Sequence, residues 1–508
     1  MSLTSAFNII NSAFDANAAQ TAAISRNISN SSTTGYTLKT ANLATSSYGG
    51  VEVTSITRAT NSALLEQALA ANSQSAGQSA LASGLAQLSA TVSDSSSTNS
   101  TSSTTTASGQ SPSAMLASLE TALQNYQASP SDPTVAQSVV TAASQLTSSL
   151  NNATTTVQQV RSQADAAMAQ SVTTINSLLS QFQTVNNTIV SGLQTGADVT
   201  DAEDSRDDIL TQLSQQIGIS TVTSSNGSEA IYTDSGVTLF QTTARAVTFA
   251  PTQTLTAGAT ANPVMVDGVP VTGSSSPMAI QSGALAGLAT LRDTTAPQYQ
   301  AQLDQIANGL VNAFAETNQA TPSTPNPLPG LFTYSSYSGA MPTDTTVPAG
   351  LAGQIEVNAS VDPSQGGNVN LLRDGDISGG GANYTYNATG AASYTTRIQQ
   401  MISQISATQA FDPSAGAGSS DSLTDYADAS VSWVQAQYQQ ATDQANYSST
   451  LATTASQALS NATGVNLDDQ TSQMLSLENS YQTSAKLLTT VNNMFSSLLT
   501  AVTAVLPA

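Results

Sequence analysis

Charged side chains are densest between residues 201 and 208, the first place where the sequence offers chemistry. The cluster consists of Asp201, Glu203, Asp204, Arg206, Asp207 and Asp208. One reading is a divalent-cation site, because carboxylate oxygens are the ligands that such ions prefer. The spacing matches no calcium-binding loop, and several of these side chains would point to different faces of a helix. We interpret the cluster as a helix start, where the helix dipole favours anions.

Two glycine-containing motifs between residues 374 and 381 contain residue types that occur in metal and phosphate sites. Asp374-Gly375-Asp376 could supply two metal ligands, but this pattern is first of all typical of a turn. The glycine run at 379–381 is not followed by Lys and Ser or Thr, and no strand–helix frame surrounds it. It therefore does not predict a phosphate-binding loop. We expect no metal ligand and no cofactor here.

The chain contains no Cys and no His. The absence of Cys excludes disulfides and thiolate catalysis, and the absence of His excludes the Ser-His-Asp triad and the usual zinc ligands. A secreted hydrolase that uses only carboxylates stays open as a distant alternative. It would need two acidic groups that face one cleft about 5–10 Å apart. We predict no catalytic residue and a protein that is not an enzyme.

Charge is scarce and mostly negative. Only 8% of the residues are charged, with 32 acidic and 10 basic side chains and a net charge of −22. The basic residues are spread singly, so no basic patch is available for a nucleic acid or an anionic membrane surface. No apolar core of a secretory signal precedes Arg26, and the apolar tail at 494–508 is shorter than the ~20 residues of a spanning helix. We expect neither nucleic acid nor membrane as a partner.

The first 28 residues carry an apolar seam with alternating steps of four and three. Its members are Leu3, Phe7, Ile10, Phe14, Ile24 and Ile28, with Asn17 and Thr21 as polar positions in the same register. This is the heptad rule for a helix that packs on other helices. A break is expected at 30–35, where Gly35 is free to adopt positive φ.

The last 42 residues carry a matching seam. Leu467, Met474, Tyr481, Leu488, Phe495 and Val502 follow one another at steps of seven, and Leu477, Val491 and Leu498 occupy intervening positions. Two such helices at opposite ends of the chain are suitable partners for one another. We predict that they pair and that these residues form an assembly seam. The alternative is an ordinary amphipathic helix that packs on a globular core.

The middle of the chain alternates between helical and strand-like patterns. A run of apolar residues at helical spacing covers 135–193, which would span about 90 Å as one helix. Short strands are expected within 218–249, with a hairpin turn at Asn226-Gly227 and a second hairpin around Asp267-Gly268. The Ser/Thr tract at 93–113 predicts a flexible connector, and 422–459 predicts a second long helix.

These patterns predict a mainly α fold with a smaller β part. The terminal helices pair in a coiled-coil-like domain, and the outward-facing middle combines a bundle of long helices with short β-strands. The expected segments are an N-terminal axial helix and loop at 1–46, a helical rod domain with β-hairpins (about 218–272) at 47–320, a reduced outer segment rich in Pro and Gly at 321–394, return helices at 395–462 and a C-terminal axial helix at 463–508.

Several motifs resemble those of the axial proteins of the bacterial flagellum. Asn27-Ile-Ser-Asn30, followed by Thr34-Gly35-Tyr36-Thr37, resembles the N-terminal signature shared by rod, hook and junction proteins. The segment Leu477-Glu-Asn-Ser-Tyr481 with Ala485-Lys486 is similar to their shared C-terminal helix. Asn27, Asn30, Gly35 and Tyr36 are the signature positions that this resemblance singles out.

Three other motifs narrow the resemblance to the hook-associated protein 1 (FlgK) family, the junction proteins between hook and filament. They are Gly464-Val-Asn-Leu-Asp468, Asp204-Ser-Arg-Asp207 and the stretch from Ser282 to Leu288. A hook or rod protein is the alternative, because it shares both end signatures. The long middle helix argues against it, because those proteins consist mostly of strands between their ends.

The resemblance implies a structural subunit that joins hook to filament and is located outside the cell on the flagellum. It implies export in unfolded form through the flagellar type III apparatus, and folding on assembly. The implied partners are other copies of the same chain in a ring, the hook protein, the second junction protein and an export chaperone on the C-terminal helix.

Overall fold

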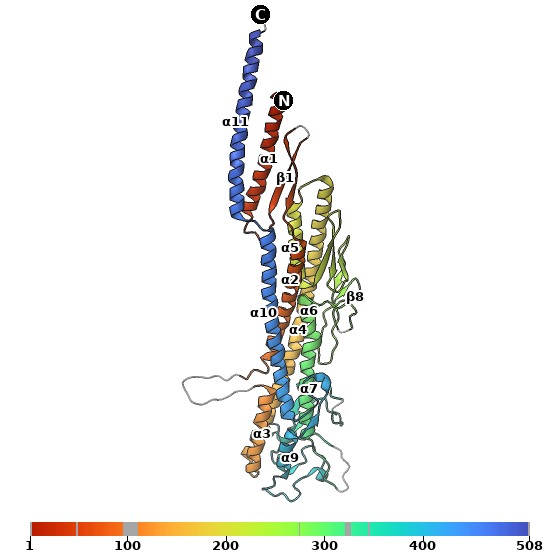
Figure 1. The fold of residues 1–508 in the computed structure, drawn as a ribbon. Coiled ribbons are helices and arrows are strands. Elements are labelled where there is room, and N and C mark those ends of the chain that lie inside the picture. The colour runs from red at the N-terminus through yellow and green to blue at the C-terminus, as the bar shows by residue number, and fades with distance from the viewer. Residues whose placement is uncertain are drawn as a thin grey trace, which may run out of the picture.

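The computed structural model describes residues 3–46, 49–94, 110–273, 275–320, 327–343 and 346–505. Within these ranges the chain forms an elongated molecule with both ends of the chain at one tip (Figure 1). Most of the predicted connector at 93–113 lies outside the described residues.

The two terminal helices lie side by side, so their predicted pairing is confirmed. They are α1 (Leu3–Ser29) and α11 (Leu467–Val505), which run in opposite directions (Figure 1). The rings of Phe14 and Tyr481 meet edge to face, with centroids 5.1 Å apart. With 39 residues against 27, α11 extends well beyond the start of α1.

Long helices form the body of the molecule, in agreement with the predicted bundle. They are α2 (Ser62–Ser89), α3 (Pro112–Ala128), α4 (Pro133–Thr195), α5 (Thr200–Gln216), α6 (Ala284–Thr290), α7 (Ala296–Ala313), α9 (Thr396–Ser406) and α10 (Leu423–Thr463), with a π-helical turn at Leu291–Thr295. The 63-residue α4 contains the predicted run 135–193. Asp132 caps its start by accepting a hydrogen bond from the backbone N–H of Thr134, and Gly196 ends it in the left-handed conformation.

All strand pairs of the described residues are antiparallel. They form the hairpin β1 (Lys39–Thr45) with β2 (Val51–Arg58), a sheet of β3 (Ile219–Thr223), β4 (Glu229–Thr233) and β5 (Thr238–Phe240), a sheet of β6 (Val247–Thr248), β7 (Met265–Val266) and β8 (Val269–Pro270), and the two-stranded pairs β9 (Phe332–Tyr334) with β10 (Ile355–Val357) and β11 (Gln409–Ala410) with β12 (Ser420–Asp421). Asn226-Gly227 forms the predicted turn between β3 and β4, with Gly227 at a φ of 82°.

Two apolar cores follow one another along α4. The first lies at the end far from the termini, where Leu146 and Leu150 of α4 pack with residues of α3, α7 and α10. The second surrounds Ile175 and Phe182 of α4, and includes side chains of α5 and of the β3–β4–β5 sheet. A single helix therefore connects both cores and makes the body continuous.

The segment predicted at 321–394 is folded into the first core where the structure describes it. It consists of β9, β10, the short helix α8 (Leu371–Asp374) and 3-10 turns at Leu351–Gly353, Ala359–Val361, Pro363–Gln365 and Ala382–Tyr384, and a further such turn follows at Pro413–Ala415. Phe332, Ile355 and Leu372 are fully buried there among residues of α4 and α7. This segment occupies the end of the molecule opposite the termini (Figure 1).

The stretch after α1 differs from the expected loop. Residues 39–45 and 51–58 pair as the β1–β2 hairpin, and the expected boundary between 46 and 47 falls inside it. The hairpin also touches α5, so it connects the terminal helix to the body. The boundary is therefore wrong, because strand pairing makes the two sides one unit.

The close crossing of α2 and α6 gives a test of the body. A methyl group on Gly287 would overlap the carbonyl oxygen of Gly77, a backbone atom that has little room to move. We expect Gly287→Ala to lower the free energy of unfolding by about 2 kcal/mol, because overpacking forces backbone shifts. The exposed Thr290→Ala on the same helix is the control and should change it by less than about 0.5 kcal/mol. Equal effects in urea unfolding would contradict this reading of the crossing.

Candidate assembly site

The predicted seam of α1 is divided between buried and exposed positions. Ile10 and Ile24 are buried, Leu3, Phe14 and Ile28 are half-buried, and Phe7 is exposed. Asn17, a polar member of the same register, is buried and donates a hydrogen bond to the Ser480 hydroxyl (3.3 Å). The contact between α1 and α11 is therefore partly polar.

The predicted seam of α11 is mostly exposed. Met474 and Leu488 are half-buried, whereas Leu467, Tyr481, Phe495 and Val502 are 47%, 56%, 45% and 50% exposed. The positions of α11 that are buried are polar ones, Gln470 and Ser484. Apart from Tyr481, whose ring meets Phe14, and the half-buried Met474 and Leu488, this seam therefore stays available in the single chain, and its role in assembly remains a prediction.

Asn27 joins α1 to both α11 and the hairpin. It is fully buried, and its amide donates hydrogen bonds to Gln470 Oε1 (2.8 Å) and to the backbone carbonyl of Lys39 (2.9 Å). Its Oδ1 atom accepts from the Lys39 N–H and from the Tyr36 hydroxyl, each at 3.0 Å. The Nδ2 and Oδ1 atoms of Asn27 therefore each have two hydrogen-bond partners. Removing this side chain would leave buried polar groups without a partner, which costs free energy.

The other signature residues shape the turn that leads to this contact. Gly35 has a φ of 81°, which favours glycine. Asn30 donates from its amide to the carbonyl of Arg26 (2.9 Å) near the helix end. The structure therefore brings Asn27 and Tyr36 together, with Asn30 and Gly35 in the adjoining turn.

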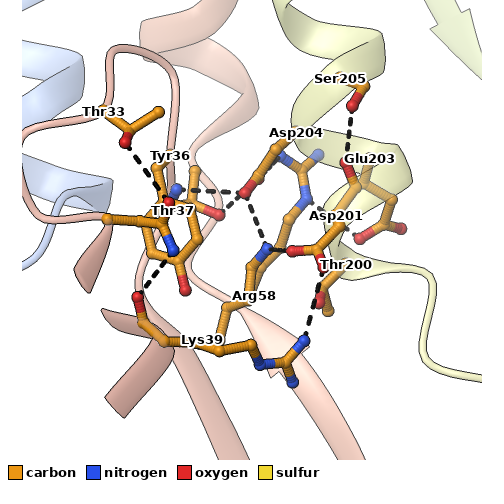
Figure 2. Close-up of polar contacts among 12 residues, drawn as sticks. Thr33, Tyr36, Thr37, Lys39, Arg58, Thr200, Asp201, Glu203, Asp204 and Ser205 are labelled. Atoms are coloured by element: carbon orange, nitrogen blue, oxygen red, sulfur yellow. Dashed lines mark hydrogen bonds and ion pairs between the residues drawn. The ribbon is translucent and has the colours of Figure 1, made fainter. Parts of the chain in front are cut away.

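Asp204 of α5 connects the hairpin to the body (Figure 2). Its carboxylate lies 3.0 Å from Lys39 Nζ and 3.2 Å from Arg58 Nη1, and it accepts a hydrogen bond from the Thr37 hydroxyl (2.6 Å). Lys39 and Arg58 come from the two strands of the hairpin, at its base. One carboxylate therefore binds both strands.

Further carboxylates of α5 surround the same two cations. Arg58 pairs with Glu203 (3.0 Å) and Asp207 (2.5 Å), and Lys39 also contacts Asp201. Burial opposes the charge on Arg58, but Asp207, Glu203 and Asp204 outweigh it and hold the pKa of Arg58 above its usual value. The joint is therefore a network of fixed charges.

The interpretation of residues 201–208 as a helix start holds, because α5 begins at Thr200. Two members of the cluster, Asp204 and Arg206, are buried, and Arg206 binds Glu229 at 2.9 Å. The reason is tertiary: the hairpin and the β-sheet bring cations and anions from distant parts of the chain. Among the described residues, no group of acidic side chains is arranged to hold a metal ion.

Sequence reasoning missed Lys39 and Arg58 as partners of this cluster. The rarity of basic residues could have predicted these ion pairs. With 32 acidic and only 10 basic residues, nearly every Lys or Arg can find a carboxylate partner. The buried polar positions Gln470 and Ser484 were missed as well, because a search for apolar steps of seven passes over them. In the described part of the chain, no helix has the length and apolar character needed to cross a membrane.

Comparison with known families gives two matches. Residues 98–321 match the helical domain of the flagellar hook-associated protein FlgK. Residues 455–501 match the C-terminal domain of the flagellar basal body rod proteins FlgEFG. The resemblance to the FlgK family is therefore confirmed by a match that includes all of α4, and the C-terminal match includes most of α11.

Individual proteins are similar to part of the chain. The chain is 28% identical over 208 residues to flagellar hook-associated protein 1 of Salmonella typhimurium and, equally, of Salmonella typhi. Each alignment covers 40% of this chain and 37% of the relative, so it spans well under half of each protein. The solved hook junction protein FlgK of Burkholderia pseudomallei aligns with a TM-score of 0.40 and 24% identity, over 53% of this chain and 46% of that one.

The network at Asp204 gives a sharp stability prediction. Asp204→Asn leaves Lys39 and Arg58 short of their shared carboxylate, and we expect it to lower the free energy of unfolding by about 3 kcal/mol. Asp208→Asn is the matched control, because Asp208 is exposed and accepts a hydrogen bond only from Gln212 among the described contacts. It should cost less than about 0.5 kcal/mol. Similar costs in urea unfolding would mean that the network contributes little.

Proposed function

From the FlgK helical domain at residues 98–321, we propose that this chain is a structural subunit of the bacterial flagellum that joins the hook to the filament. The observation that carries the proposal is the coexistence of that domain with the α1–α11 pair at one tip of the molecule. The match to that domain supports the junction class, and the exposed side chains of the helix pair support an assembly role.

The exposed apolar side chains of α11 support an assembly role. Leu487, Met494, Phe495, Leu498 and Leu499 are all 45–67% exposed. Burying a large apolar side chain contributes about 1.5–3 kcal/mol. Such a row is unfavourable in water, so a role in contacts with other subunits explains why it faces outward.

We propose that the partners are further copies of the chain, the hook protein on one side and the second junction protein on the other. An export chaperone that covers α11 before assembly fits the same exposed side chains. Passage as an unfolded chain through the flagellar type III apparatus fits the lack of Cys, since no disulfide would have to be broken. The chain then acts outside the cell.

A hook or rod protein is the second candidate, because residues 455–501 match the C-terminal domain of rod proteins. The helical domain at 98–321 and the 63-residue α4 favour the junction protein. A carboxylate hydrolase is the third and weakest candidate. A groove lined by the 31–37 turn, α2, α5 and α10 holds five carboxylates, of which Glu203 and Asp207 bind Arg58 and Glu229 binds Arg206. The other two, Glu66 and Asp208, are exposed side chains of different helices. We propose that the chain is not an enzyme.

The exposed face of α11 can be tested with a single charge. Phe495→Asp places a carboxylate in the proposed seam, and burying it unpaired costs several kcal/mol. Phe495 is 45% exposed in the single chain, so the variant should fold and be exported normally. In the source bacterium without its own copy, we expect filaments to be lost and flagellin to appear in the medium, measured by electron microscopy and immunoblotting.

The control is Phe495→Leu, which keeps an apolar side chain at the same position of α11. It should support normal filaments. Full-length filaments with Phe495→Asp would refute the seam, whereas retention of that variant inside the cell would indicate a lost export function instead.

Protease sensitivity tests whether assembly orders the terminal helices. Lone helices are marginal in water, and much of α11 lacks a partner in the single chain. Limited proteolysis of the purified chain should cut beyond residue 464 and before residue 45 first, and leave a stable middle fragment that mass spectrometry identifies. Early cleavage within 135–193 with both ends protected would contradict the proposal.

A further inference from the structure

The basic side chains of this protein are almost all used within the chain. Arg26, Lys39, Arg58, Arg206, Arg245, Arg292 and Arg373 bind carboxylates, and Arg161 and Arg397 donate to backbone carbonyls. Lys486 of α11 is exposed, and among the described contacts it is the one basic side chain without such a partner. For a chain with a net charge of −22, one cation without a partner among the described residues is a specific feature.

Asp15 is the matching feature on α1. It is the one acidic residue of this helix, it is exposed, and its carboxylate has no partner among the described contacts. The two terminal helices therefore each present an isolated charge of opposite sign.

These two charges point away from the contact between the helices. Asp15 precedes the buried Asn17 by two residues, and Lys486 follows the buried Ser484 by two residues. Two residues correspond to about 200° around a helix, so each charge lies nearly opposite the side that faces the other helix. The α1–α11 pair therefore presents Asp15 on the outer side of α1 and Lys486 on the outer side of α11, the helix that also carries Asp468, Asp469 and Glu478 nearer its start.

The two charges also lie at nearly the same height. The hydrogen bond between Asn17 and Ser480 fixes the register of the antiparallel pair. Counted from this level toward the tip that holds the chain ends, Asp15 lies two residues along α1 and Lys486 lies six residues along α11. At about 1.5 Å per residue, the two heights differ by about 6 Å. A lysine side chain can bridge most of that distance.

We propose that Lys486 of one copy pairs with Asp15 of a neighbouring copy, so that α11 of each subunit packs beside α1 of the next. The proposal rests on the proposed function, in which copies assemble side by side. Such a contact is heterologous, and it repeats around a closed ring. An exposed pair adds little affinity, so its effect is to set the height at which neighbours meet, while the exposed Leu475 and Met494, which lie toward the same side of α11 as Lys486, supply apolar attraction.

The absence of native Cys permits a direct test. In the variant with both Asp15→Cys and Lys486→Cys, the two thiols of one chain face opposite ways and should not join. Oxidation of flagella sheared from cells that carry this variant should give a ladder of linked subunits on a non-reducing gel. The control pairs Asp15→Cys with Asn493→Cys, which lies on the same face about 10 Å further along α11 and should give much less product.

Charge reversal gives the second measurement. Asp15→Lys alone or Lys486→Asp alone should weaken each contact about fivefold and reduce the number of attached filaments. The variant with both reversals should restore them, because the pair is rebuilt with its charges exchanged.

The outcomes separate the two proposals. Attached filaments without a ladder in the Cys variant, or no rescue by the double reversal, would overturn the pairing and leave the junction function intact. If the Cys variant makes no filaments, rescue by the double reversal supports the pairing. Failure of the unmodified chain to attach filaments in the same cells would instead count against the junction function.

Discussion

The Asp204 carboxylate is the constraint on which the arrangement of this molecule depends. It binds Lys39 and Arg58, which stand on paired strands at the base of the hairpin, and so holds that hairpin against α5. The hairpin in turn carries the backbone of Lys39 to Asn27, which binds Gln470 of α11. The direction of both terminal helices relative to the body is therefore set by a chain of polar contacts. Breaking a buried pair leaves uncompensated charge, so this geometry has a steep energetic preference.

Local periodicity explains what the sequence revealed. The apolar steps of three and four in 135–193 predicted α4, and the heptads at both ends predicted that α1 and α11 pair. The same heptads mark the side of α11 that meets α1, because Tyr481 contacts Phe14 and the buried Gln470 and Ser484 lie three residues after Leu467 and Tyr481 in the same repeat. They did not reveal how little of that side α1 covers, since Leu467 and Tyr481 stay 47% and 56% exposed. A periodic pattern shows that a helix has an apolar face, but it does not show whether that face is covered within the chain or by another molecule.

Long-range electrostatics explains what the sequence concealed. Residues 39–45 were expected in the loop after the first helix, and residues 51–58 in the helical rod domain, yet they form β1 and β2. Their Ser and Thr residues gave no strand pattern strong enough to be noticed, and pairing with one another stabilises both strands. Arg58 and Asp204 are separated by 146 residues, and no local spacing links them. The charge cluster at 201–208 was visible, but its burial follows from the position of the hairpin.

A polar contact between the terminal helices has a consequence for order and assembly. Hydrogen bonds such as that between Asn17 and Ser480 exchange for water with a net gain of only about 1 kcal/mol each. The stronger apolar attraction of α11 stays directed outward, toward side chains that the single chain does not supply. A helix pair of this kind has its partner and register defined in advance, yet most of its stability arises only when neighbours cover it. Assembly and completion of the fold are then one process, and a chain that keeps this part of its folding energy for assembly is suited to travel unfolded and become rigid where it is incorporated.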